Sequence, residues 1–305
     1  MPGAARRTFF EFEWNNATGL LRVGVSFALI DFNARLSALG LFVPHGQCSH
    51  VRLGGHFQTG GYGQLARSFG LFGDHVVGFE IIMADGVRRT VMRDSPETAA
   101  ADGSAVSDRD LFFAVLGGSP GNFGVITHLH LRPLRDKDYP SSRGLKILLH
   151  YSRDVVEKLL VLLSEMIDDP DYSGDYDFSI TVLSGNKIWS YSPDYDEMRL
   201  KYPAEFGTDE LPALIRAPQL ILVYLQYSGR TATRAFDPTL FTNVKKICGY
   251  YFTFHEVTDA AHTPMSNLTG AWLFLDVREF DLAGPRDELG QGARTRVGQV
   301  GRRPY

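Results

Sequence analysis

The pattern of apolar and polar positions predicts a chain that mixes helices and strands. Apolar residues recur at helical spacing over 28–39, and Gly40 directly after them is a typical helix end. The apolar run 76–84 predicts a strand, and the Asp-Gly pair at 85–86 predicts a tight turn into a returning strand at 87–92. Further elements are expected as strands at 21–25, 41–43 and 125–131 and as short helices at 64–69 and 110–116, the last capped by Ser107 or Asp108.

The second half of the chain shows the same mixture after a charged and proline-rich boundary at 132–142. Strands are expected at 145–151, 178–183 and 219–227, and helices at 154–167 and 238–248. This arrangement is typical of an antiparallel sheet with helices on one face. We therefore expect an α+β protein with two domains, 1–135 and 143–283. The glycine- and arginine-rich stretch 284–305 has the composition of a disordered tail.

Composition excludes several classes of function. The 305 residues are 44% hydrophobic and 22% charged, with a net charge of −4, which gives no electrostatic case for binding nucleic acid. No apolar run reaches the roughly 18–20 residues of a membrane span, and the N-terminus lacks the apolar core of a secretory signal. The compartment stays open, with the cytoplasm as the default and secretion if a further segment precedes this N-terminus.

The most informative stretch is the glycine-rich run at 43–63. It holds Cys48, one of two cysteines, followed by Gly-Gly-His at 54–56 and Gly-Gly-Tyr-Gly at 60–63. Glycines in such number let the backbone turn with positive φ or approach a ligand closely. The run leads into the predicted helix at 64–69, whose first amides could face an anion. Taken alone, however, Cys48 could be a small buried residue, and the glycines could serve turns only.

A second block, at 110–127, contains Asp-Leu-Phe-Phe-Ala-Val-Leu-Gly-Gly and then Gly-Asn-Phe-Gly-Val-Ile-Thr. Together the two blocks resemble the berberine-bridge-enzyme-like branch of the vanillyl-alcohol-oxidase superfamily of flavoprotein oxidases. The resemblance is strong over 20–130. It implies a partial PCMH-type FAD-binding domain followed by an antiparallel-sheet cap domain that faces a small-molecule substrate.

The resemblance also implies roles for individual residues. In the family, a cysteine at the place of Cys48 can form a thioether to the flavin ring, and the Gly-Gly-His histidine, here His56, bonds the cofactor. The expected cofactor-binding residues are Cys48, Gly54, Gly55, His56, Gly60, Gly61, Gly63, Gly117, Gly118 and Val125. A helix end is already a sufficient structural reason for Gly117 and Gly118.

The catalytic base stays unknown at this stage. Gln226 and Tyr227 end an apolar strand and are candidates to project toward the flavin, although such residues more often simply end a strand. His128 and His130 share a strand face but have no carboxylate or cysteine at ligand spacing, so no metal site is expected. Neither a P-loop nor a Gly-x-Ser-x-Gly elbow is present.

The function implied by the resemblance is that of an FAD-dependent oxidase that takes a hydride from an alcohol- or amine-bearing carbon and is reoxidised by oxygen. Members of the family also have an earlier flavin subdomain and a C-terminal catalytic segment, and neither is recognisable here. We therefore expect a chain truncated at both ends, naturally or through its gene model. The alternatives are a catalytically inactive relative with weak or no flavin binding, and a protein that binds another nucleotide through the same loop.

Overall fold

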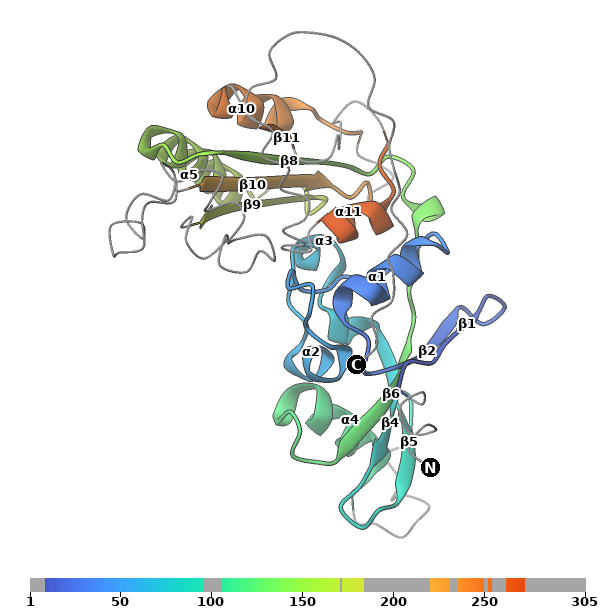
Figure 1. The fold of residues 1–305 in the computed structure, drawn as a ribbon. Helices are drawn as coiled ribbons and strands as arrows, with labels where there is room; N and C mark the ends of the chain where they lie inside the picture. The colour runs from blue at the N-terminus through green and yellow to red at the C-terminus, as the bar shows by residue number, and fades with distance from the viewer. Residues whose placement is uncertain are drawn as a thin grey trace, which may run out of the picture.

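The computed structural model describes residues 9–95, 106–170, 172–183, 220–230, 235–249, 252–253 and 262–271. Their secondary structure forms two main antiparallel sheets, one of five strands and one of four, with helices packed on them. Figure 1 shows the sheets at opposite ends of the molecule, with helices α1, α3 and α11 between them. The α+β class expected from the sequence is confirmed. The proposed tail at 284–305 lies outside the described residues, and the domain limits stay predictions.

The five-stranded sheet, here called the first sheet, has the strand order β1-β2-β6-β4-β5. Its strands are β1 Phe12–Asn15, β2 Leu20–Gly24, β4 Val76–Ile82, β5 Arg88–Met92 and β6 Val125–Leu131. Alternate residues point to opposite faces, so Leu21, Phe79 and Leu129 are fully buried in the core of this domain. The predicted turn between β4 and β5 is present, with Gly86 at a φ of 83°. Strand β1 was missed because four residues are too few for a clear alternating pattern.

Short helices lie on the core face of the first sheet or, in the case of α3, between the two sheets (Figure 1). They are α1 Leu29–Ser37, α2 Leu53–His56, α3 Ala66–Phe69 and α4 Asp108–Phe113, with 3₁₀ turns at Phe57–Thr59 and Phe72–His75 and a π-helical turn at Ala114–Gly118. Helix α1 ends at Ser37 with Ala38 as its C-cap, so Gly40 is not the cap as predicted but follows two residues later, with a left-handed φ of 64°. Of the two proposed caps of α4, Ser107 takes the role, because its Oγ accepts from the amide of Asp110 at 3.1 Å.

The other face of the first sheet carries an ionic cluster centred on Glu80. Arg22 donates to this carboxylate from Nε at 2.6 Å and from Nη2 at 3.2 Å, and Arg88 donates as well. His128 and His130 also lie on this face, within 3.4 and 3.5 Å of Glu80 oxygens. Among the described residues, no group of three or more His, Cys, Asp or Glu side chains is arranged to hold a metal ion. The cluster is therefore a network of ion pairs.

The four-stranded sheet, here called the cap sheet, has the order β11-β8-β10-β9. Its strands are β8 Arg143–His150, β9 Tyr176–Leu183, β10 Leu220–Tyr227 and β11 Phe252–Thr253. Helices α5 Arg153–Asp168 and α10 Thr239–Cys248 pack on one face, where Ile221, Val223 and Leu225 of β10 join their apolar residues in one core. The expected antiparallel sheet with helices on one face is confirmed.

A junction joins the two domains. Strands β3 Leu41–Phe42 and β7 Leu134–Arg135 pair with each other, followed by a 3₁₀ turn at Asp136–Asp138. Helix α11 Met265–Ala271 packs beside α1 and β3, and Asp136 accepts from the amide and hydroxyl of Ser266 at 2.8 and 2.6 Å. In the described part of the chain, no helix is both long and apolar enough to cross a membrane.

Candidate functional site

The glycine-rich run forms a loop anchored on the first turn of α1. The amides of Leu29 and Ile30 donate to the carbonyls of Val51 and Ser49 at 2.9 and 3.1 Å. These bonds satisfy helix-start amides that would otherwise lack an intrahelical partner. Cys48, next to Ser49, is a free and exposed thiol. The loop therefore presents its cysteine to the outside and not to the core.

His56 holds the segment that leads to Cys48. Its Nε2 accepts a hydrogen bond from the amide of Gly46 at 3.0 Å, and its ring packs edge-on against Phe72, with 5.4 Å between ring centroids. Burial lowers the pKa of His56 to about 4, so the imidazole is neutral near pH 7. Its Nε2 is thus occupied by the protein's own backbone. Whether Nδ1 bonds a cofactor stays a prediction.

The structural requirement for glycine differs among the five glycines of the loop. A Cβ on Gly63 would lie 1.8 Å from the carbonyl oxygen of His45, and one on Gly61 would lie 2.4 Å from Cβ of Phe72. Packing of the loop on itself therefore explains both. Gly54 packs against Val25, and Gly60 has a φ of 86°. By contrast, a Cβ on Gly55 would meet nothing within 4 Å, so its backbone borders open space.

The second glycine block lies beside this loop. The side chain of Gln58 joins the two blocks, because it accepts from the amide of Gly121 at 2.9 Å and donates to the carbonyl of Gly54 at 2.6 Å. Gly117 and Gly121 are exposed, and a Cβ on either would meet nothing within 4 Å. Gly118 is similarly open, with its nearest neighbour atom at 3.9 Å. Two loops from distant parts of the sequence thus expose bare backbone side by side.

Val125, the remaining predicted cofactor contact, starts β6 and is 64% exposed. Two hydrogen bonds connect this strand to the loop: the amide of Gly54 donates to Val25 at 3.2 Å, and the amide of Val25 donates to Thr127 at 3.1 Å. The start of β6 therefore lies beside α2. The neighbouring Ile126 points into the core, so the Val125 side chain points away from it, and contact of Val125 with the cofactor stays a prediction.

A buried polar network, which the sequence did not reveal, joins the end of the loop to the cap sheet. Ser68 of α3 and Gln226 of β10 each donate to Oδ2 of Asp177 on β9 at 3.0 Å. Tyr224 donates to Oε1 of Gln226 at 3.2 Å. Burial raises the pKa of Asp177 to about 6, although the hydrogen bonds from Ser68 and Gln226 act in the opposite direction. Next to this network, Gln64 donates to Ser179 at 3.0 Å.

The two substrate-side candidates do not come together. Gln226 is fully buried on the face of the cap sheet that meets α3, whereas Tyr227 points to the helix-covered face and packs against Tyr176, with 4.9 Å between ring centroids. Adjacent residues of a strand point to opposite faces, so the two side chains cannot line one site. Of the pair, only Gln226 faces the first domain.

Comparison with known proteins agrees with this geometry. Residues 7–91 match the family described as FAD binding domain. Hexose oxidase of Chondrus crispus is 39% identical over 128 residues, which are 40% of this chain and 22% of that protein. Berberine bridge enzyme-like 4 of Arabidopsis thaliana is 39% identical over 88 residues, which are 28% of this chain and 14% of that protein.

The first part of the chain is an FAD-binding domain. It is similar to part of berberine bridge enzyme-like 4, and the cofactor that the matched domain indicates is FAD. The fold extends the likeness: the carbohydrate oxidase from Microdochium nivale superposes with a TM-score of 0.54 at 18% identity, over 90% of this chain and 47% of that one. The chain thus spans less than half the length of the proteins it matches.

The residues present fit the cofactor. A Cβ on Gly55, Gly117 or Gly121 would meet nothing within 4 Å, so an extended dinucleotide can approach the backbone there, although the amide of Gly121 already donates to Gln58. The exposed thiol of Cys48 stands in the same loop. Bound FAD would supply a hydride acceptor. The chain's own contributions are a neutral His56 that fixes the loop and a buried network that ties the loop's end to the cap sheet.

Proposed function

We propose that this chain acts as an FAD-dependent oxidase, or as the flavin-binding and cap part of one. It would take a hydride from an alcohol- or amine-bearing carbon of a small molecule, and oxygen would accept the electrons. The observation that carries the proposal is the pairing of an exposed Cys48 with the bare backbone around Gly55, in a loop that His56 holds from within. The relatives named as oxidases support the reaction class.

Within this proposal, Cys48 carries a covalent link to the flavin. An exposed thiol on an anchored loop can reach a bound group without unfolding anything, whereas Cys248 is only 5% exposed in the core of the cap domain. Covalent attachment would fix the cofactor and raise its potential, which suits transfer of electrons to oxygen. The substrate would lie between the flavin and the cap-sheet face that carries Gln226.

The first experiment is the visible absorbance spectrum of the purified protein and of its acid-precipitated pellet. We expect a yellow protein whose colour stays in the pellet. Cys48→Ala should release the colour into the supernatant, and the matched control Cys248→Ala should keep it in the pellet. A protein that stays colourless after incubation with FAD would contradict the proposal and favour the inactive relative. Colour that Cys48→Ala leaves in the pellet would contradict the covalent role of Cys48.

A further inference from the structure

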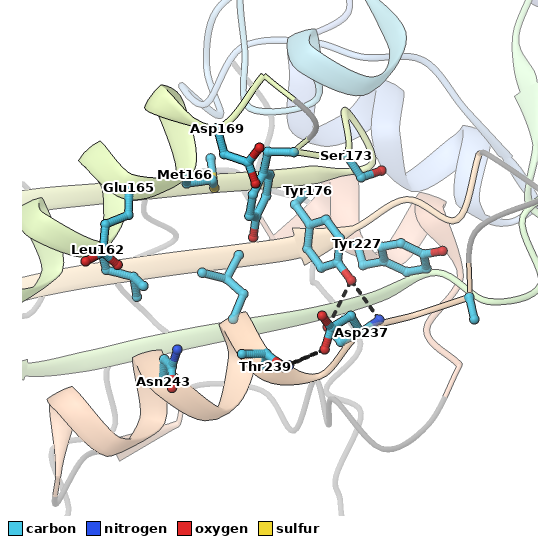
Figure 2. A pocket seen from close by; sticks show the side chains of 13 residues that line it. Leu162, Glu165, Met166, Asp169, Ser173, Tyr176, Tyr227, Asp237, Thr239 and Asn243 are labelled. Atoms are coloured by element: carbon cyan, nitrogen blue, oxygen red, sulfur yellow. Dashed lines mark hydrogen bonds between the residues drawn. The ribbon is translucent and has the colours of Figure 1, made fainter.

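The cap domain contains a cavity that the flavin site does not use. It measures about 560 Å³ and lies between α5 and α10, on the helix-covered face of the cap sheet. Figure 2 shows side chains from both helices and from the ends of β9 and β10 pointing into it. Gln226 and Asp177 are on the opposite face of the same sheet, so this cavity is separate from the surface that meets the first domain.

The floor of the cavity is aromatic. Tyr176 packs against Tyr227 and Tyr172, with ring centroids 4.9 and 5.7 Å apart. The Tyr176 hydroxyl is fixed by the backbone of Asp237, since it donates to the carbonyl and accepts from the amide, both at 2.9 Å. The Tyr172 hydroxyl has no hydrogen-bond partner in the described part of the chain. The floor is therefore rigid, and one phenol remains available.

The rim of the cavity is acidic. Glu165, Asp169 and Asp237 line it, and none of the described lining residues is a lysine or arginine. Glu165 has no hydrogen-bond or ion-pair partner among the described residues. Asp237 accepts from the amide and hydroxyl of Thr239 through Oδ1, at 2.9 and 2.6 Å, which leaves its Oδ2 available. The negative charge at the rim is thus only partly compensated.

The carboxylates of the rim affect the pKa of Tyr172 on the floor of the cavity. Burial raises the pKa of the Tyr172 phenol, and the charges of Asp237 and Asp169 raise it further, while Arg67 acts in the opposite direction with a smaller effect than Asp237. Two carboxylates therefore stand close to the aromatic floor. A positive ligand in this place would interact with ring faces and carboxylates at once.

We propose that this cavity binds a small organic cation, with an alkylammonium head group on the tyrosine floor and the carboxylates of Glu165 and Asp237 around it. Ring faces attract cations, and the attraction strengthens where water is displaced. A neutral ligand of the same shape would gain the apolar contacts only. The site is independent of the flavin loop and stands whether or not the chain is an oxidase.

The test compares two probes of matched shape on the intact chain, by ligand-observed NMR titration. Choline carries a quaternary ammonium group, and 3,3-dimethylbutan-1-ol is its neutral analogue. We expect choline to bind about tenfold more tightly than the alcohol. Equal affinities, or the absence of choline binding at millimolar concentrations, would overturn the proposal.

Variants then locate the site. Tyr172→Leu removes a ring face and should weaken choline binding about tenfold, whereas Tyr172→Phe keeps the ring and should retain most of it. The double variant Glu165→Gln/Asp237→Asn should abolish the preference for choline. Its control, Asp31→Asn/Asp85→Asn, makes the same change in net charge in the first domain, at α1 and at the β4–β5 turn, and should leave binding unchanged. Wild-type affinity in the Glu165/Asp237 variant would show that choline binds elsewhere.

Discussion

The two domains each bury an acidic residue in an apolar strand, and they treat it in opposite ways. In the first sheet, Glu80 is surrounded by cations: burial alone would raise its pKa, but hydrogen bonds from Arg22 and Arg88 lower it to about 2. In the cap sheet, Asp177 accepts hydrogen bonds from neutral groups, the side chains of Ser68 and Gln226 and the backbone of Arg67. Burial raises its pKa to about 6, although these bonds and the charge of Arg67 act in the opposite direction. Both side chains are nearly inaccessible, so exposure does not explain the contrast.

The difference shows that the partner, and not burial, decides the charge of a buried carboxylate. A guanidinium offsets the loss of water around Glu80 and keeps it ionised, whereas hydroxyl and amide groups only partly do so for Asp177. The first sheet therefore contains a permanent ion pair. The junction between α3 and the cap sheet contains a carboxyl group that gains or loses its proton near pH 6.

The largest expected effect comes from breaking the ion cluster. Glu80→Gln leaves Arg22 and Arg88 without their shared carboxylate, and we expect a loss of about 2–4 kcal/mol in the free energy of unfolding of the first domain. This loss can be measured by following the hydrogen exchange of the β4 amides during chemical denaturation. Glu13→Gln is the control, because Glu13 contacts the same Arg22 at 3.3 Å but its side chain is 60% exposed, and it should cost less than about 1 kcal/mol. Equal losses would show that the cluster acts only as a surface network.

The second prediction concerns the pH dependence of the two domains. The folded pKa of Asp177 lies above the unfolded value of 3.8, so its contribution to stability is fully present below pH 3.8 and is lost as the pH rises through 6. The total change is about 3 kcal/mol at most. Glu80 behaves oppositely: its contribution is present above pH 4.5 and is lost as the pH falls toward 2. Hydrogen exchange of the β9 and β4 amides across this pH range distinguishes the contribution of Asp177 from that of Glu80.

Asp177→Asn sharpens this prediction. The amide oxygen can still accept from Ser68 and Gln226, but it cannot ionise, so the loss of protection in β9 between pH 4 and 6 should disappear. A profile that is unchanged in the variant would mean that another group causes the pH dependence.

The smallest expected effect comes from removing a single hydrogen-bond partner of Asp177. Ser68→Ala removes one hydrogen bond that lowers the pKa of Asp177, so the pKa should rise further, as measured by the carboxyl ¹³C chemical shift. Gln64→Ala removes the neighbouring bond to Ser179, which does not touch Asp177, and should leave that pKa unchanged. A lower pKa in Ser68→Ala would contradict the assigned role of the hydroxyl.

The sequence predicts most of the fold because periodicity and turn residues act locally. The expected ranges recover α1, the β4–β5 hairpin and, in the cap domain, β8, α5, β9, β10 and α10, but neither β11 nor α11. Strand β1 and helix α2 were missed, since each has only four residues and Leu53–His56 consists half of glycine. Tertiary packing stabilises both elements, and no local pattern reports it.

The candidate site, like the fold, was predicted only in part from the sequence. The spacing around Cys48 predicted the loop, while the division of its glycines into packed and open ones required the structure. Ser68 and Asp177 are 109 positions apart, so no sequence window could join them. One misplacement was avoidable: strand alternation alone separates Gln226 from Tyr227.

The close approach of Gly63 to the carbonyl of His45 bears on how such sequences evolve. A loop whose glycines are required by its own packing is kept by selection for folding, even in a lineage that has given up its cofactor. Gly61 and Gly63 would then persist as a record of ancestry. Packing does not require Cys48 or Gly55, so these two residues should be retained only where the cofactor is still used.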